Sequence, residues 1–414
     1  MKRERVVITG MGTINALGYN TESFAHALRQ GVCGIAPLTL FDTSAYRTHM
    51  GAEIKFLDPV AMIPPPFSRK RMSRADIMAF ASVTEALQGA GLIPFPPEMA
   101  DHTGIVAGVG SGGKFEAEGV FETYLRNGGK RTRFSRLSPL CPASSADRIA
   151  TAWEFTGPKA TFMTACSSGT TAIGFARDLI ASRTADIIIA GGVETLSRTT
   201  YATFNALQAI SPGYCRPFAA DRDGLSIGEA AAFLILEGQT HALTRGASIY
   251  GEVLGYGVTC DSFHMTTPDP EASGAVRAIA AAIADAHISA TDIDYICAHG
   301  TATPTNDLME TKAIKEVFGK KSYQIPVSSI KSMTGHTLGA SGALAAVASL
   351  IAIREGFIPP TIHHDTPDPA CDLDYVSAGA RPALLNKILI NSFAFGGNNT
   401  SLVLGRYAEK VKSS

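Results

Sequence analysis

A cysteine set among small and hydroxylated residues is the first feature of this sequence that could do chemistry. Cys166 lies in the stretch FMTACSSGTTAIGFA, directly before a largely apolar run at 170–182 that predicts a buried helix. A thiol at a helix N-terminus faces the positive end of the helix dipole, which favours the nucleophilic thiolate. The alternative is an inert cysteine that packs as a small apolar side chain. Its place at a strand-to-helix corner makes Cys166 the candidate nucleophile.

Two histidines lie in loops rich in glycine and threonine. His299 follows the apolar segment YIC, so it marks the end of a strand, where α/β folds place their sites. Thr301 and Thr303 follow at a spacing of two, which turns both hydroxyls toward one side of an extended segment. His336 lies in SSIKSMTGHTLGASG, before a helix of small residues. A lone histidine is more often structural, but these neighbours favour a functional site.

A lysine stands in the same loop as His336, with little charge around it. Lys331 lies between SSI and SMTG, and this setting predicts a buried rather than a solvated ammonium. A buried lysine needs a partner of opposite charge. We expect Glu310 or Asp307, from the segment that follows His299, to supply it.

Strands and helices alternate along the chain and must position these loops. Apolar segments that run into glycine turns predict strands, and the patterns between them predict helices. The predicted strands are 5–12, 104–113, 185–194, 230–238 and 293–301, and the predicted helices are 73–90, 170–182, 273–287 and 307–318. This alternation predicts an α/β protein built from layers.

The chain also contains a weak internal repeat. TACSSGTTA (164–172) and TGHTLGASG (334–342) share the pattern T-x-(C/H)-(S/T)-x-G-x-(S/T), and Cys166 and His336 take the same place in it. Chance similarity between biased loops is the alternative. If the repeat is real, the chain is a duplicated α/β unit, and each half contributes one catalytic group to a shared site.

Composition bounds the class of protein. Apolar residues make up 45% and charged residues 18%, which suits a large buried core. The net charge of −1 provides no drive toward nucleic acid or a membrane. The seven cysteines are scattered without a CxxC pair, so we predict neither a disulfide framework nor a metal site. No signal peptide or membrane span is predicted, the apolar stretch 341–353 is read as a core helix, and we expect a soluble cytoplasmic protein.

The motifs together resemble one family. TACSSG, HGTATPTND and SSIKSMTGHTLGASG are similar to the motifs of the β-ketoacyl-[acyl-carrier-protein] synthases of the elongating, synthase II-like Cys–His–His type, which includes type II polyketide ketosynthases. The resemblance runs in order from VVITGMG near the start to NSFAFGGNN at 391–399. It implies the thiolase fold, with duplicated halves stacked in five α-β-α-β-α layers. We expect residues 1–255 to form the half with the nucleophile and residues 256–414 the half with both histidines.

The resemblance also implies a reaction. Enzymes of this type take an acyl chain onto the cysteine and condense it with malonyl-[acyl-carrier-protein], which loses CO₂, in fatty-acid or type II polyketide synthesis. The product is a β-ketoacyl chain longer by two carbons. No tightly bound cofactor is implied, because the substrates are carried on the phosphopantetheine of the acyl carrier protein.

Roles for individual residues follow from the same resemblance. The backbone N–H groups of Cys166 and Phe395 would form the oxyanion hole, and the Phe395 ring would gate the acyl pocket. His299 and His336 would face the malonyl thioester oxygen, and which of them assists decarboxylation stays open. Lys331, paired with Glu310, would orient His336.

Substrate and partner contacts are implied too. Thr266, Thr301 and Thr303 would hydrogen-bond the phosphopantetheine arm. Carrier proteins are acidic, so the basic segment SRKRMSR (68–74) is interpreted as their docking site. Its cationic residues are Arg69, Lys70, Arg71 and Arg74. A second basic segment, KRTRFSR, lies at 130–136; a solvated face is the alternative for both, and no nucleic-acid-binding motif is present.

Three other functions were weighed. A papain-like protease would need the C-G-(S/A)-C-(W/Y) signature, which is absent. A degradative thiolase would need a second catalytic cysteine near the C-terminus, and the last cysteine, Cys371, is not in such a motif. A partner subunit that mainly determines chain length would lack the nucleophile. Since Cys166 and both histidines are present, we expect the active member of a homodimer, or of a heterodimer with a cysteine-lacking paralogue.

Overall fold

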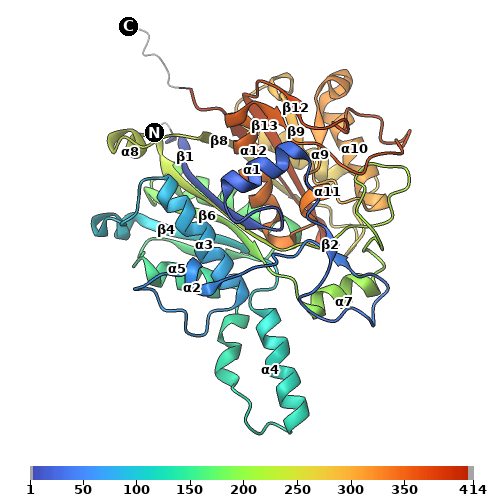
Figure 1. Ribbon diagram of the computed structural model, residues 1–414. Helices are drawn as coiled ribbons and strands as arrows, with labels where there is room; N and C mark the ends of the chain where they lie inside the picture. Colours follow the sequence, from blue (N-terminus) through green and yellow to red (C-terminus); the bar gives the residue numbers. More distant parts are fainter. Residues whose placement is uncertain (1–2, 409–414) are drawn as a thin grey trace.

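The structure is a computed structural model that describes residues 3–408 (Figure 1). Its described residues contain one ten-stranded sheet in the order β10-β9-β13-β14-β8-β1-β7-β6-β4-β5. The strands are β1 (Val6–Asn15), β4 (Thr103–Val109), β5 (Lys159–Phe162), β6 (Ile187–Glu194), β7 (Ala230–Gly238), β8 (Gly251–Cys260), β9 (Tyr295–Cys297), β10 (Val327–Ser328), β13 (Lys387–Ala394) and β14 (Asn398–Gly405). Two small ladders pair β2 (Ala36–Pro37) with β3 (Met50–Gly51) and β11 (Phe357–Ile358) with β12 (Arg381–Pro382).

The sheet consists of two halves with the same topology. In the N-terminal half β4 is parallel to β5 and β6, while β7 is antiparallel to β6 and β1. In the C-terminal half β9 is parallel to β10 and β13, while β14 is antiparallel to β13 and β8. The halves join where β1 pairs with β8. The duplication is therefore confirmed. Residue 255 lies inside β8, and the division of the chain into 1–255 and 256–414 stays a prediction.

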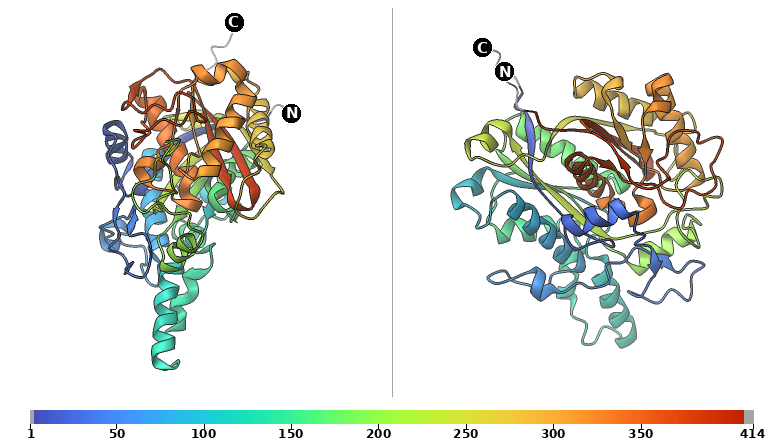
Figure 2. Two further views of the ribbon diagram at one scale, coloured as in Figure 1. Left: turned by 90° about the vertical axis from the view of Figure 1, so that its right-hand side faces the viewer. Right: turned by 45° about the horizontal axis from the view of Figure 1, so that its top comes forward.

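Helices complete five layers (Figures 1 and 2). The central helices α6 (Ser168–Ala181) and α12 (Ser341–Glu355) contact strands of both halves. On the outer faces, α3 (Arg74–Gly89) and α5 (Ser144–Ala152) cover the N-terminal half, and α9 (Ser273–Asp285) and α10 (Pro304–Phe318) cover the C-terminal half. This is the thiolase-like arrangement of α-β-α-β-α layers that the sequence predicts.

Helix α12 is buried on all sides, as its uniformly small and apolar sequence requires. By length and composition, the segment Leu338–Glu355 is the one stretch among residues 3–408 that could cross a membrane, and 89% of it is buried inside the structure. The prediction of a core helix at 341–353 is thus confirmed.

A helical hairpin extends from the body of the molecule (Figures 1 and 2). It consists of α4 (Lys114–Asn127) and the 3₁₀ segment η2 (Phe134–Leu140), and the sequence analysis did not anticipate it. Several of its apolar side chains are exposed, among them Phe121, Leu125 and Phe134. The shorter helices are α1 (Thr21–Gln30), α2 (Pro59–Met62), α7 (Arg198–Ala206), α8 (Gln239–Thr244) and α11 (Lys331–Thr334), with 3₁₀ segments η1 (Pro97–His102), η3 (Ala165–Ser167), η4 (Ala290–Asp292), η5 (Gly319–Gln324), η6 (Leu338–Ala340) and η7 (Phe395–Gly397).

Candidate active site

Cys166 and His336 occupy matching corners of the two halves. Cys166 lies in η3, between β5 and the start of α6, and the residue before it, Ala165, has a φ of +51°. His336 lies between α11 and η6, and the residue before it, Gly335, has a φ of +63°. A left-handed conformation is strained for alanine and easy for glycine. In each half a residue with a positive φ therefore precedes the candidate functional side chain.

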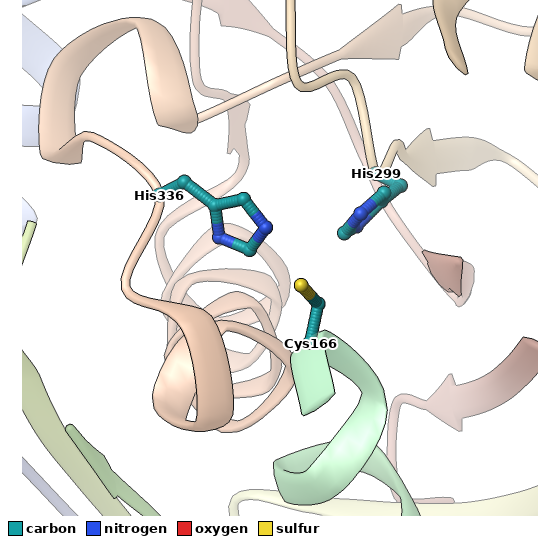
Figure 3. A group of neighbouring side chains, drawn as sticks. All are labelled: Cys166, His299 and His336. Carbon is teal, nitrogen blue, oxygen red and sulfur yellow. The ribbon is translucent and has the colours of Figure 1, made fainter. Parts of the chain in front are cut away.

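The structure brings the three predicted groups together (Figure 3). The Cys166 sulfur points between the imidazole rings of His299 and His336. All three residues are buried, and the sulfur and one nitrogen from each ring lie within 4.8 Å of one another. The ring centroids of His299 and His336 are 5.3 Å apart at an interplanar angle of 85°. The thiol thus lies near one ring nitrogen of each imidazole.

Burial sets the protonation states of this site. Burial, reinforced by the neighbouring Lys331 ammonium, lowers the pKa of both His299 and His336 well below its usual value. Both imidazoles are therefore neutral at pH 7. These side chains are also metal-ligand types, but the buried Lys331 ammonium beside them disfavours a further cation.

Burial also raises the pKa of the Cys166 thiol to about 11. The Lys331 ammonium and the backbone N–H groups of Phe395 and Cys166 oppose this shift. The position of Cys166 before a helix predicts a dipole that favours the thiolate, and burial outweighs that effect. The thiol of Cys166 is therefore protonated at neutral pH.

Backbone contacts fix the His336 ring. Its Nδ1 accepts the backbone N–H of Leu338 at 3.1 Å, so the neutral ring carries its proton on Nε2. Its own backbone N–H donates to the Ser226 carbonyl at 2.6 Å. By contrast, Nδ1 of His299 is buried without a hydrogen-bond partner among residues 3–408. One imidazole is thus locked as an N–H donor, and the other keeps a free nitrogen.

The sequence predicts an ion pair between Glu310 and Lys331, and the structure does not show one. The Glu310 carboxylate instead accepts the backbone N–H groups of His299 at 2.8 Å and Gly300 at 2.7 Å, and the Asn391 amide at 3.1 Å. Within the described part of the chain no carboxylate oxygen lies within 4.0 Å of the Lys331 ammonium. Glu310 therefore holds the His299 loop, and Lys331 acts on the site through space.

Asp307, the other expected partner of Lys331, is occupied elsewhere. Its carboxylate accepts the backbone N–H of Phe218 at 2.7 Å and of Ala302 at 3.2 Å. Burial raises its pKa to about 6. Asp307 thus supports the turn between His299 and α10.

The predicted substrate-binding residues line one pocket with the catalytic group. Thr266, Thr301, Thr303 and Phe395 all border it, together with Cys166. The hydroxyls of Thr301 and Thr303 lie 2.9 Å apart. The Phe395 ring is partly exposed and stacks on Phe204 with a centroid distance of 5.8 Å. The ring therefore stands at the mouth of the pocket, where the sequence analysis expected a gate.

The predicted docking residues separate into two groups. Arg69, Lys70 and Arg71 are exposed. Arg74 is not available for docking, because its side chain is only 12% exposed and binds both oxygens of buried Glu229, at 2.5 and 2.9 Å. The start of α3 must bury Arg74 to pack against the body, and the assignment of Arg74 to carrier docking was wrong.

Tertiary structure joins the two basic segments. Arg71, from the first segment, lines a cavity of about 720 Å³ at the base of the α4 hairpin. Arg131, Arg133 and Arg136, from the second segment, line the same cavity, as does Arg198. Glu194, a buried carboxylate near Cys166, is not among the site residues that the sequence predicts. Its only signal in the sequence is an acid at the end of the apolar strand 185–194.

A buried thiol between two neutral imidazoles, at the junction of duplicated thiolase-like halves, defines a condensing acyltransferase. Profiles of two known domains match the chain: "Beta-ketoacyl synthase, N-terminal domain" over residues 3–242 and "Beta-ketoacyl synthase, C-terminal domain" over residues 250–365. The chain belongs to the beta-ketoacyl synthase family.

Full-length relatives agree with this assignment. The chain is 40% identical to 3-oxoacyl-[acyl-carrier-protein] synthase 2 of Synechocystis, with 98% of this chain and 99% of the relative covered. It is 38% identical to the synthase of the same name from Coxiella burnetii, with the same coverage. Among solved structures it is similar to the ishigamide ketosynthase/chain length factor (TM-score 0.92, 36% identity, 98% of this chain and 100% of that chain). A beta-ketoacyl synthase from Burkholderia phymatum gives a TM-score of 0.90 at 35% identity, with the same coverage.

Proposed function

We propose that the protein condenses an acyl group held on Cys166 with malonyl-[acyl-carrier-protein], with loss of CO₂, to give a β-ketoacyl carrier protein longer by two carbons. The observation that carries this proposal is the buried group in which the Cys166 thiol and the imidazoles of His299 and His336 lie within 4.8 Å. A nucleophile beside two neutral N–H donors fits acyl transfer followed by enolate stabilisation.

The first step is acyl transfer. The Cys166 sulfur attacks the carbonyl carbon of an acyl thioester, and the C–S bond to the phosphopantetheine sulfur breaks. The departing sulfur takes up the proton that the thiol loses, so the step is balanced. The backbone N–H groups of Cys166 and Phe395 face the thiol and stabilise the transient oxyanion.

The second step is decarboxylative condensation. The N–H groups of His299 and His336 donate to the malonyl thioester oxygen, where negative charge develops as the bond to the carboxylate breaks and CO₂ leaves. The enolate carbon then attacks the acyl carbonyl on Cys166. A carbon–carbon bond forms, the carbon–sulfur bond breaks, and the sulfur takes up one proton from the solvent. Neutral imidazoles suit this step, because they donate hydrogen bonds without being consumed.

Carrier protein delivers both substrates in this proposal, and no tightly bound cofactor takes part. Thr266, Thr301 and Thr303 offer hydroxyls and polar atoms along the pocket that would receive the phosphopantetheine arm. Exposed Arg69 and Lys70 precede Arg71, which lines the cavity together with four other arginines and with Glu116, Glu118 and Glu122. The excess of arginine over glutamate supports docking of an acidic carrier.

The alternative function, a partner subunit that mainly sets chain length, is not supported by this site, because the nucleophile and both histidines are present. We infer an active subunit in a homodimer, or in a heterodimer with a cysteine-lacking paralogue. The exposed apolar side chains of the α4 hairpin support a subunit contact there. One similar structure is titled a ketosynthase with its chain length factor.

The test is to incubate the purified protein with a panel of acyl carrier proteins and to measure the mass of the peptide that contains Cys166. Acylation by saturated chains of many lengths assigns the protein to fatty-acid elongation. Acylation only by short or unsaturated chains, or only with a second subunit, assigns it to a polyketide or polyene route. Absence of any mass shift, in a protein that is folded and supplied with each donor, would contradict the proposal.

A further inference from the structure

A buried carboxylate joins three backbone segments next to the active site. Glu194 ends β6 and is 1% exposed. Its Oε2 accepts the backbone N–H of Gly110 at 2.8 Å and of Gly339 at 3.1 Å. Its Oε1 accepts the hydroxyl of Ser111. Gly110 and Ser111 follow β4 in the N-terminal half, whereas Gly339 belongs to η6 in the C-terminal half, so this one side chain connects the two halves.

The backbone segments around Glu194 lie too close together for a side chain at Gly339 or Gly192. A Cβ on Gly339 would lie 2.5 Å from the Gly110 nitrogen and 2.8 Å from Oε2 of Glu194. A Cβ on Gly192 would lie 2.8 Å from the Gly339 carbonyl oxygen. Because backbone contacts backbone here, the N–H groups of Gly110 and Gly339 have no room for water, and they need an acceptor from the protein.

The turn that Glu194 holds is the turn that orients His336. Leu338 begins η6 and has a φ of +44°, a strained conformation for a branched side chain. In this conformation its N–H donates to Nδ1 of His336. A strained turn persists only when its surroundings hold it. The next peptide N–H, of Gly339, is bound by Glu194.

Glu194 forms no ion pair within 4.0 Å across residues 3–408, and the nearby Lys114 ammonium offsets only part of the effect of burial on its carboxylate. Burial raises the pKa of its carboxyl group, and its charge in turn raises the pKa of the Cys166 thiol. A buried carboxylate without an ion pair near a nucleophilic thiol is costly for both stability and reactivity. The three hydrogen bonds that it accepts offset this cost.

We propose that Glu194 is a positioning residue, which holds the turn 338–340 against Gly110 and Ser111 and so keeps the His336 ring aimed at the thioester oxygen. The inference rests on the proposed role of His336 in stabilising the enolate. Glu194 contributes through the geometry of its three hydrogen bonds, and its carboxylate transfers no proton.

Geometry and charge can be separated at this position. In a Glu194→Gln variant the amide oxygen can accept both backbone N–H groups, and the amide nitrogen can donate to the Ser111 hydroxyl, which also accepts. Glutamine thus preserves all three contacts and removes the charge. Alanine removes the contacts as well. Ser111→Ala is the matched control, because it removes one contact and leaves both backbone contacts in place.

The experiment measures two half-reactions in each purified variant: release of CO₂ from malonyl carrier protein, and acylation of Cys166 read by peptide mass. Glu194→Ala is expected to lower CO₂ release by about tenfold to a hundredfold more than acylation, as for a small misplacement of a reacting group. Glu194→Gln is expected to keep CO₂ release within about threefold of wild type, because the geometry is retained. It should also speed alkylation of Cys166 by iodoacetamide, since loss of the charge lowers the thiol pKa.

Two outcomes would overturn the inference. If glutamine lowers CO₂ release as far as alanine does, the charge itself acts. If alanine lowers the rates of both half-reactions by the same factor in a folded protein, the residue is only structural. Should the alanine variant not fold, the glutamine variant alone still decides between geometry and charge. A wild-type protein that shows neither half-reaction would contradict the proposed function, not the role of Glu194.

Discussion

The two halves of the molecule share one topology and use it for different chemistry. At one corner, η3 before α6 presents Cys166, and the matching corner before α12 presents His336. At a second corner, β9 leads into His299, whereas its counterpart β4 leads into Gly110 and Ser111. At these two pairs of equivalent corners, the N-terminal half therefore supplies the proposed nucleophile and a small polar loop, and the C-terminal half supplies both proposed N–H donors.

Both second corners are held in the same manner. Glu310 accepts the backbone N–H groups of His299 and Gly300, and Glu194 accepts those of Gly110 and Gly339. These carboxylates come from different elements, α10 and β6. The duplicated scaffold thus fixes where the loops begin and end. Buried carboxylates, which come from a different element in each half, fix how the loops are oriented.

The strongest test of the different roles proposed for the two halves is removal of the Cys166 thiol. Cys166→Ala should lower condensation by about a thousandfold or more, because no other group can hold the acyl chain. Circular dichroism should show an intact fold, since alanine fits the space of a buried cysteine. Condensation at a substantial rate would show that the N-terminal half does not carry the nucleophile.

The next test concerns the C-terminal half. His336→Ala should lower CO₂ release from malonyl carrier protein by about a hundredfold, and should lower acylation of Cys166 much less, since it removes a donor to the enolate oxygen. His299→Ala is the matched variant, and comparing the two identifies which imidazole contributes more to decarboxylation. A larger loss in acylation than in CO₂ release would reassign His336 to the first step.

The pH dependence of the thiol tests the electrostatics that the halves share. Because the pKa of Cys166 is raised to about 11, its thiolate fraction grows with pH across the whole accessible range. Alkylation of Cys166 should therefore rise about tenfold per pH unit between roughly pH 7 and 9, without a plateau. Lys331→Met should slow alkylation, because the ammonium lowers the thiol pKa. A plateau near neutral pH would show a thiolate in the resting enzyme.

The smallest expected effect concerns docking on the N-terminal half. Reversing the charges of Arg69, Lys70 and Arg71 should raise KM for carrier-bound substrate by about tenfold with little change in kcat, because docking precedes chemistry. An unchanged KM would place docking elsewhere. Arg74→Gln is the contrasting variant: it leaves buried Glu229 unpaired and should lower the free energy of unfolding by about 3–5 kcal/mol, measured by chemical denaturation.

Local pattern was enough to find the reacting groups. Cys166, His299 and His336 each lie where an apolar strand or a glycine turn meets a helix, and such corners are encoded by neighbouring residues. The repeat around Cys166 and His336 also predicted the duplication, because in both halves a residue with a positive φ precedes the candidate functional residue. Sequence alone therefore determined the chemistry and the layered fold.

The partners of buried charges were decided only by tertiary structure. Glu310 binds the His299 backbone rather than Lys331, Arg74 binds Glu229 rather than solvent, and Glu194 spans the two halves. A charged residue can have several candidate partners at similar separations along the chain, and packing alone selects among them. The same holds for the cavity at the base of the α4 hairpin, where Arg71 and Arg131 line one space although they are distant in the sequence. Local periodicity holds no information about such distant contacts, since they depend on which surfaces the layers bring together.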